Sequence, residues 1–281
     1  MEEKDLYSYL PYFNFSAPPF SLVPDSAFFF PAKSHLESIE VLSFALHQGN
    51  LISVLTGEPG LGKTQVLLTL LSRLPEDIKQ IHIINPALCP SEFLATIFQE
   101  LNLSPSEREL NKDEILKKLK ALFLHHQNPF KRILLVIDEA QLLPIETLEE
   151  LRLLTNLNEG GNLFLQIFLI GQPGLADKLR LPQLSPLRQR ISIWEILRPF
   201  TKEEIFPYLW FRIKQVSQAP DVVLEKKIEK HLYKWTKGIP RIINKLMDRT
   251  LFIAYVRREK IIKKGHLKEA KRTFTEGLLS S

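Results

Sequence analysis

The stretch TGEPGLGKTQ, residues 56–65, has the glycines, lysine and hydroxyl that could hold a chain of phosphates. From Gly57 to Thr64 it matches the pattern G-x-x-x-x-G-K-[ST]. Glycines let the backbone curl so that successive N–H groups point at phosphate oxygens, and a helix that follows adds its positive N-terminal end. Lys63 would reach the β- and γ-phosphates and Thr64 would hold Mg²⁺. A chance match is the alternative, but a predicted strand before the motif and a predicted helix after it favour the phosphate site.

A second motif, RILLVIDE, ends in two acidic residues directly after an apolar segment. We expect Asp138 to contribute to the Mg²⁺ shell together with Thr64. Glu139 would orient and polarise the attacking water, so the pair predicts ATP hydrolysis by positioning and charge stabilisation. The alternative is that the two acids cap the next helix. Their position in a chain that already has the phosphate motif favours the catalytic interpretation.

Four further polar residues are candidates for the same chemistry. Gln172 follows an apolar segment and would contact the γ-phosphate and the water, although it is also suited to a plain turn. Arg188 and Arg190 precede the last apolar segment and would act on a neighbouring subunit's nucleotide; a surface salt bridge is their alternative, and Arg190 is the favoured one. Arg241, in the segment GIPR, would begin a helix, where a cation is poorly placed unless an anion such as a γ-phosphate is present.

These interpretations give a complete set of expected site residues. The expected catalytic residues are Lys63, Glu139, Gln172, Arg190, Arg188 and Arg241. The nucleotide is expected to contact Gly57, Glu58, Pro59, Gly60, Leu61, Gly62, Lys63, Thr64, Gln65, Asp138 and Arg241. The metal ligands are expected to be Thr64 and Asp138.

Alternating apolar and helical patterns predict the scaffold that must position these residues. Five strands are predicted at 51–56, 80–85, 132–137, 163–170 and 191–197, and helices between them at 63–74, 91–103, 111–126 and 145–157. This alternation predicts a parallel sheet covered on both faces. The pattern changes near residue 198, where Thr201 and Glu204 form a capping box. Helices are predicted at 202–217, 223–236, 240–257 and 265–275, with no further strand.

Together these segments resemble an AAA+ ATPase, and more narrowly the family of general secretion pathway protein A and its shorter relatives. The stretches that carry the resemblance are PYFNFSAPPFSLVPDSAFFFP, TGEPGLGKT, VIDEAQLL, LEELRLLTNL, LIGQPGL, LRQRI and KGIPRIINKLMDRTL. The resemblance implies an α/β fold: a P-loop AAA+ core with a five-stranded parallel sheet between helices, then a small all-helical lid. It assigns Walker A to 57–64, Walker B to Asp138 and Glu139, sensor 1 to Gln172, an arginine finger to Arg190 or Arg188, and sensor 2 to Arg241.

The resemblance also implies a division of the chain and an ATP-dependent ring or helical homo-oligomer. Residues 1–50 would be an arm and helix packed on the core, 51–198 the nucleotide-binding core, and 199–281 the lid. Pro24, Asp25 and His35 would lie near the adenine. Longer members of the family carry a membrane span and a peptidoglycan-binding region after the ATPase; this sequence contains neither, so we expect the short type.

Composition narrows the class of protein. The 281 residues have one cysteine, no signal peptide and no apolar run of the roughly 20 residues that cross a bilayer. We therefore expect a cytoplasmic protein without a direct membrane span. The formal net charge is +5, which permits contact with an anionic polymer without requiring it. The basic run KIIKKGHLKEAKR, residues 260–272, would contact DNA phosphates or form a solvated helix face.

Three functions follow from this sequence. The first is an ATPase that assembles on double-stranded DNA and regulates a transposase or recombinase. The second is an assembly ATPase that works with the proteins of a type II secretion-like system. The third is a nucleotide-gated scaffold with negligible turnover.

Overall fold

The computed structural model divides the chain into two compact units. It describes residues 9–279 except 24, 85, 102–113, 115–116, 120, 123–129 and 159–162. One unit, here called the sheet unit, contains residues 35–59 and 66–197. The other, here called the helical unit, contains residues 1–34, 60–65 and 198–281, so it combines both ends of the chain with part of the phosphate motif.

The sheet unit contains one five-stranded parallel sheet. Its strands are β1 (Ile52–Thr56), β2 (Ile78–Ile83), β3 (Arg132–Ile137), β4 (Leu165–Gly171) and β5 (Ile191–Ile196). Their order is β2-β3-β4-β1-β5, so β4 lies between the strands that carry the two phosphate-site motifs. The five predicted strands are therefore confirmed. The carboxyl ends of β1, β4 and β3 lie at one edge, where ligands bind in open parallel sheets.

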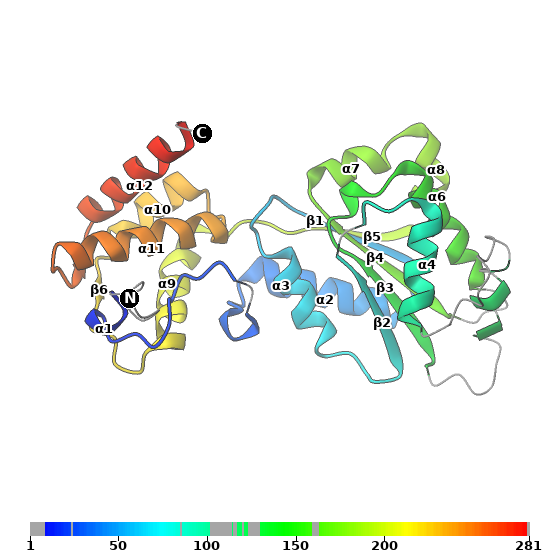
Figure 1. Ribbon diagram of the computed structural model, residues 1–281, viewed down its shortest axis with the longest axis horizontal. Helices are drawn as coiled ribbons and strands as arrows, with labels where there is room; N and C mark the ends of the chain where they lie inside the picture. Colours follow the sequence, from blue (N-terminus) through cyan, green and yellow to red (C-terminus); the bar gives the residue numbers. More distant parts are fainter. Residues whose placement is uncertain are drawn as a thin grey trace. The chain divides into compact units, whose positions relative to one another are not determined.

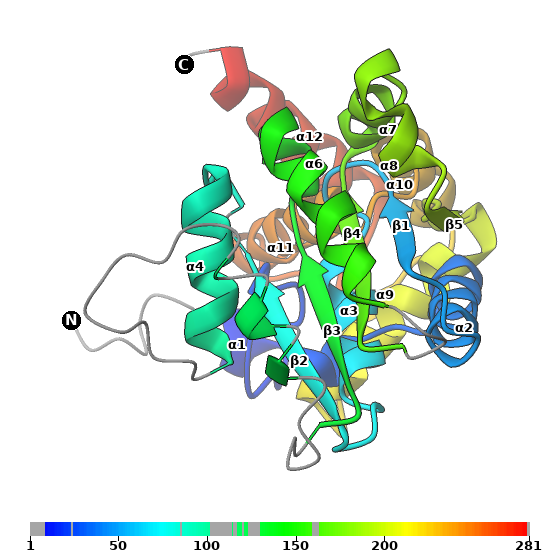
Figure 2. The ribbon, with the colours of Figure 1, turned by 90° about the vertical axis from the view of Figure 1, so that its right-hand side faces the viewer.

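Helices cover both faces of this sheet (Figures 1 and 2). Helices α4 and α6 lie on one face, and α2 and α3 lie on the other. Every residue of β1 and β4 is buried, as expected for strands with both faces covered. The helical segments are α2 (Lys33–His47), α3 (Lys63–Leu71), α4 (Pro90–Glu100), η3 (Ala140–Leu142), α6 (Ile145–Leu154), η4 (Thr155–Leu157), α7 (Pro173–Leu179), η5 (Pro182–Leu184) and α8 (Ser185–Arg188).

The C-terminal part of the helical unit is built from four helices and one short strand pair. Its elements are α9 (Lys202–Val216), β6 (Val223–Leu224), α10 (Ile228–Thr236), α11 (Pro240–Val256), β7 (Ile261–Ile262) and α12 (Lys264–Leu279). Thr201 and Glu204 form the predicted capping box at the start of α9. The expectation that no strand follows residue 198 is wrong, because β6 and β7 pair in parallel. Segments of two residues have too few positions to show a period in sequence.

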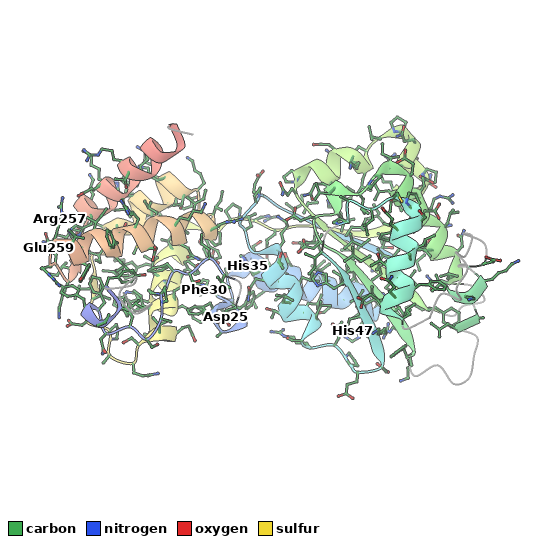
Figure 3. The ribbon with its side chains drawn as sticks, in the orientation of Figure 1. Asp25, Phe30, His35, His47, Arg257 and Glu259 are labelled. Carbon is green, nitrogen blue, oxygen red and sulfur yellow. The ribbon has the colours of Figure 1, made fainter. Side chains whose placement is uncertain are left out.

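The N-terminal arm packs with these C-terminal helices, whereas the sequence placed it on the core. Phe13 and Phe20 share a buried cluster with residues of α9, α10 and α11. The arm contains α1 (Tyr9–Tyr12) and η2 (Ser26–Phe28). The ring of Phe30, labelled in Figure 3, packs against those of Phe200 and Tyr208. The apolar content of the arm indicated that it would be packed, but apolar content cannot distinguish the core from the C-terminal helices as the packing surface.

A buried arginine on α9 fixes the arm. Arg212 is 6% exposed, and its Nε donates to the carbonyl oxygen of Pro19 at 2.6 Å. A second guanidinium nitrogen donates to the carbonyl oxygen of Ser21 at 2.8 Å, and the guanidinium lies 4.1 Å from the ring centroid of Phe28. Burial lowers the pKa of Arg212. These charge-assisted bonds make the arm an integral part of the helical unit.

Two boundaries differ from the predicted ones, and one prediction falls outside the described residues. Strand β2 begins at Ile78 because it pairs in register with β3 from Arg132 onward. Helix α3 ends at Leu71 rather than at residue 74. The residues that follow it form backbone turns that end at Leu74. Most of the helix predicted at 111–126 lies outside the described residues.

Candidate active site

The phosphate motif forms the connection between β1 and α3. Gly60 and Gly62 have φ angles of +83° and +97°, which glycine adopts without steric cost. Lys63 and Thr64 begin α3, so the positive end of the helix dipole lies at this turn. Leu61 and Lys63 are buried, at 1% and 7% exposure. Such a curled backbone before a helix N-terminus is suited to an anion.

Within the helical unit, the start of α11 contacts this motif. The backbone N–H of Arg241 donates to the carbonyl oxygen of Gly60 at 3.2 Å. A Cβ added at Gly60 would lie 2.7 Å from the Cβ of Arg241, so glycine is required for this approach. The amide of Gln65 donates to the carbonyl oxygen of Asp25 at 3.0 Å, which ties the arm to the same segment. The structure therefore brings Arg241 to the phosphate motif.

The turn before α11 depends on a second glycine. Gly238 has a φ of +78°, and a Cβ there would lie 2.1 Å from the carbonyl oxygen of Phe200. The backbone N–H of Phe200 donates to the carbonyl oxygen of Gly238 at 3.0 Å. This close backbone pairing fixes the position at which Pro240 and Arg241 enter the helix.

The two acidic residues follow β3 at the carboxyl edge of the sheet. Asp138 is 4% exposed, and its Oδ1 accepts the backbone N–H of Glu139 at 2.9 Å. Glu139 has a φ of +52°, in the left-handed region that non-glycine residues rarely adopt. Strain of this kind persists where the surroundings hold the residue in place.

Two glutamine amides hold the carboxylate of Glu139. Gln172, which follows β4, donates from Nε2 to Glu139 Oε2 at 3.0 Å. Gln141, in η3, donates to the same oxygen, and its Oε1 accepts the backbone N–H of Gln172 at 3.0 Å. The Gln141 side chain thus contacts both the Glu139 carboxylate and the backbone of Gln172. This network fixes the rotamer of Glu139 at the edge of the sheet.

Two members of this network were not singled out from sequence. Gln141 lies two residues after Glu139, and its proximity in the motif VIDEAQLL was the available signal. Lys178 donates from Nζ to the carbonyl oxygens of Gln141 and Leu143, at 2.6 and 2.8 Å. No spacing rule predicts it, because the contact joins α7 to η3.

Gly171 joins the network to the phosphate motif. Its carbonyl oxygen accepts the backbone N–H of Gly57 at 3.2 Å, which places the start of the motif beside the end of β4. A Cβ at Gly171 would lie 2.9 Å from Gln141 Oε1 and 2.8 Å from a methyl group of Leu175. Glycine is therefore needed for Gln141 to reach both of its partners.

The two candidate finger arginines bond within their own chain. Arg190 donates to the carbonyl oxygen of Arg152 at 3.2 Å and also contacts the hydroxyl of Thr155. Arg188 donates to the carbonyl oxygen of Leu179 at 3.1 Å. Both side chains are half-buried.

No cluster of three or more His, Cys, Asp or Glu side chains with metal-ligand geometry exists among the residues that the structure describes. Thr64 offers a hydroxyl in the helical unit, and Asp138 offers a carboxylate in the sheet unit. Mg²⁺ suits such a donor set when phosphate oxygens and water complete its octahedron.

Comparison with known proteins places this geometry in a family. Residues 46–179 match the AAA domain family. Over 249 residues the chain is 36% identical to General secretion pathway protein A of Aeromonas hydrophila, a match that covers 89% of this chain and 45% of that protein. This chain belongs to the AAA+ family. It is similar to General secretion pathway protein A and spans less than half the length of that relative.

Solved structures share the AAA+ fold. Cdc6p from Pyrobaculum aerophilum aligns with a TM-score of 0.65 at 18% identity, covering 89% of this chain and 71% of that one. Aeropyrum pernix ORC1 in complex with DNA aligns at 0.62 and 20% identity, covering 91% and 69%. The Thermotoga maritima RuvB branch migration motor aligns at 0.56 and 21% identity, covering 86% and 68%. These likenesses confirm the fold class. Within the described ranges, no helix has the length and apolar character to span a membrane.

Proposed function

We propose that Glu139 is the catalytic base of this AAA+ ATPase. The supporting observation is the pair of amides from Gln141 and Gln172 that holds its carboxylate at the sheet edge. A carboxylate with a fixed rotamer keeps an attacking water in line with the γ-phosphate, which is the main task of the protein in phosphoryl transfer. Gln172 also contacts the γ-phosphate in this proposal.

The remaining site residues bind and sense ATP. Residues 57–65 cradle the phosphates, with Lys63 on the β- and γ-phosphates. Thr64 and Asp138 hold Mg²⁺, which neutralises charge on the phosphates. Arg241 contacts the γ-phosphate from the start of α11, a role supported by its backbone bond to Gly60. Residues 1–50 act as arm and helix, 51–198 as the core and 199–281 as the lid.

Each site is completed by a neighbouring copy in an ATP-dependent ring or helical oligomer. Arg190, or Arg188 in its place, supplies positive charge to the neighbour's γ-phosphate. In this proposal, the hydrogen bonds of Arg190 to Arg152 and Thr155 are those of the unassembled chain. Hydrolysis alters the assembly and thereby remodels a partner in the cytoplasm.

Two partners are candidates for this remodelling. The 36% identity to General secretion pathway protein A favours proteins of a type II secretion-like system. A cluster of lysines on α10 and α12 favours the second candidate, a regulator that assembles on DNA with a transposase. A scaffold with negligible turnover is the third possibility.

Steady-state ATPase measurements on three proteins test the proposed base. Lys63→Ala should lose nucleotide binding, because it removes the cation on the phosphates. Glu139→Gln should retain ATP binding and lose turnover, so the ATP-bound assembly accumulates in size-exclusion chromatography. Normal turnover by Glu139→Gln would show that another group is the base. Negligible turnover by the unaltered protein at all concentrations would support the scaffold.

The same assay with and without double-stranded DNA separates the partners. Several-fold stimulation that fades as salt rises supports the DNA-associated function, because phosphate contacts release counterions. Turnover that is indifferent to DNA while the protein is oligomeric supports a secretion partner.

A further inference from the structure

A basic surface runs along two neighbouring helices of the helical unit. It is defined here as the α10–α12 surface, formed by Lys230 and Lys234 of α10, Lys264, Lys268 and Lys271 of α12, and the ring of Trp235. All five lysines are exposed and Trp235 is half-buried. Lys271 Nζ lies 4.8 Å from the centroid of the Trp235 ring, which joins the two helices.

A hollow of about 760 Å³ opens on this surface. Trp235, Lys268, Lys271 and Arg257 are among the residues that line it. Arg257 lies at the end of α11, at the turn that leads to α12 (Figure 3). The hollow therefore lies beside the Trp235 ring of α10 and is lined by Arg257 and by cations of α12.

The carboxylate in this hollow does not neutralise the lysines. Glu269 accepts a bond from Arg257. In the part of the chain that the structure describes, Lys230, Lys234, Lys264 and Lys268 have no carboxylate within ion-pair distance. Together with Lys271, these lysines place five positive charges on two neighbouring helices.

Neighbouring groups respond to this concentration of charge. The pKa of His231, on the same face of α10 as Trp235, is lowered first by desolvation and then by Lys264, Lys230 and Lys234. Lys230 and Lys234, like Lys264 and Lys268, are four residues apart, a spacing at which like charges on a helix repel each other. A bound polyanion would relieve this repulsion.

We propose that the α10–α12 surface binds the phosphate backbone of double-stranded DNA without reading its sequence; this inference rests on the second candidate function. Lysine acts as a point charge that contacts phosphates and positions a duplex, whereas base edges are read by other groups. From Lys264 to Lys271 the α12 row is about 10 Å long, which matches roughly three phosphates of one strand along the duplex axis.

The apolar and aromatic residues beside the lysines argue against two other anionic partners, a membrane surface and single-stranded nucleic acid. A membrane-surface helix inserts an apolar face between lipids, but Leu267 and Ala270, on the part of α12 whose side chains the structure describes, are fully buried in the protein. Single-stranded nucleic acid is bound by stacking of bases on aromatic rings. The Trp235 ring is half-buried and carries the Lys271 ammonium, so it is not a stacking platform.

Binding of a fluorescent 30-base-pair duplex of random sequence, measured by anisotropy at several salt concentrations, tests this surface. The variant Lys230→Gln/Lys264→Gln/Lys268→Gln removes three cations. It should bind the duplex roughly 10²-fold more weakly at 0.1 M salt, with a salt slope smaller by about 2.7. The matched control, Lys117→Gln/Lys118→Gln/Lys214→Gln, removes three exposed lysines elsewhere and should bind like the unaltered protein.

Each outcome of this experiment decides between explanations. Equal affinity of the two triple variants would overturn the α10–α12 surface even if DNA binds. Binding of the unaltered protein to phosphatidylserine vesicles but not to the duplex would also overturn it. ATPase activity measured with the duplex separates the binding surface from the proposed regulator function. If the duplex binds this surface but leaves turnover unchanged, only the regulator function is rejected. If the triple variant loses basal ATPase activity, the three single variants replace it, each with an expected slope smaller by about 1.

Discussion

Replacement of Gln141 by alanine should lower turnover of ATP and leave the affinity for ATP unchanged. The substitution removes one bond to the Glu139 carboxylate and the acceptor for the Gln172 N–H. A hydrogen bond to a charged group contributes about 1.5–3 kcal/mol. At about 1.36 kcal/mol for each factor of ten in rate, its loss corresponds to a decrease in kcat of roughly 10- to 150-fold if the full contribution acts in the transition state.

The fold around residue 141 should tolerate this change. Lys178 donates to the backbone carbonyl oxygen of residue 141, which alanine retains. The assay is steady-state ATP hydrolysis over a range of ATP concentrations, with a fluorescent ATP analogue as a separate measure of binding. Gln183→Ala is a matched control, because Gln183 is exposed on η5. Gln172→Ala and the double variant complete a double-mutant cycle, and strong non-additivity is expected because the two amides contact one oxygen.

Two results would refute this reasoning. If kcat of Gln141→Ala stays within twofold of the unaltered protein, the amide does not position the base. If instead KM rises while kcat is unchanged, Gln141 contributes to ground-state binding of ATP and not to the reaction step.

Three further substitutions follow from the geometry. Gly60→Ala forces a left-handed alanine and a Cβ 2.7 Å from the Arg241 side chain at the start of α11. We expect the unfolding free energy, measured in urea, to fall by about 1–3 kcal/mol, and an ATP analogue to bind more weakly. An unchanged urea midpoint of unfolding would contradict this expectation. Gly238→Ala places a Cβ 2.1 Å from the carbonyl oxygen of Phe200, and its unfolding free energy from thermal unfolding should be lower by about 3 kcal/mol or more. The control Gly174→Ala has open space around its Cβ, and its unfolding free energy should be within about 0.5 kcal/mol of that of the unaltered protein. Arg190→Ala should keep ATP binding and lower turnover by up to roughly 10³-fold where the protein is oligomeric; unchanged turnover at high protein concentration would reject the finger.

Sequence predicted the elements whose pattern is local. The apolar run that ends at Asp138 indicated a strand buried on both faces, and the glycines of the phosphate motif indicated its curled backbone. Both depend on residues close in sequence, so composition and spacing were sufficient to predict them.

Features that join distant segments were not predictable in this way. Gln141 donates its hydrogen bond to a Glu139 whose backbone is left-handed, a conformation that glutamate rarely adopts. The arm is fixed by Arg212, which lies 191 residues from Ser21. No hydrophobic period distinguishes an arm that packs on the lid helices from one that packs on the sheet.

The union of arm and C-terminal helices in one unit has a consequence for synthesis of the chain. Residues 1–34 leave the ribosome before the rest of this unit, and most of their packing partners begin only at residue 198. At about 5–20 residues per second, the delay is roughly 8 to 33 s. During this time Phe13 and Phe20, fully buried in the finished protein, have no folded surface to cover them, while the sheet unit emerges. The arm is thus the segment of the nascent chain for which a chaperone should compete until the helices after residue 198 have emerged.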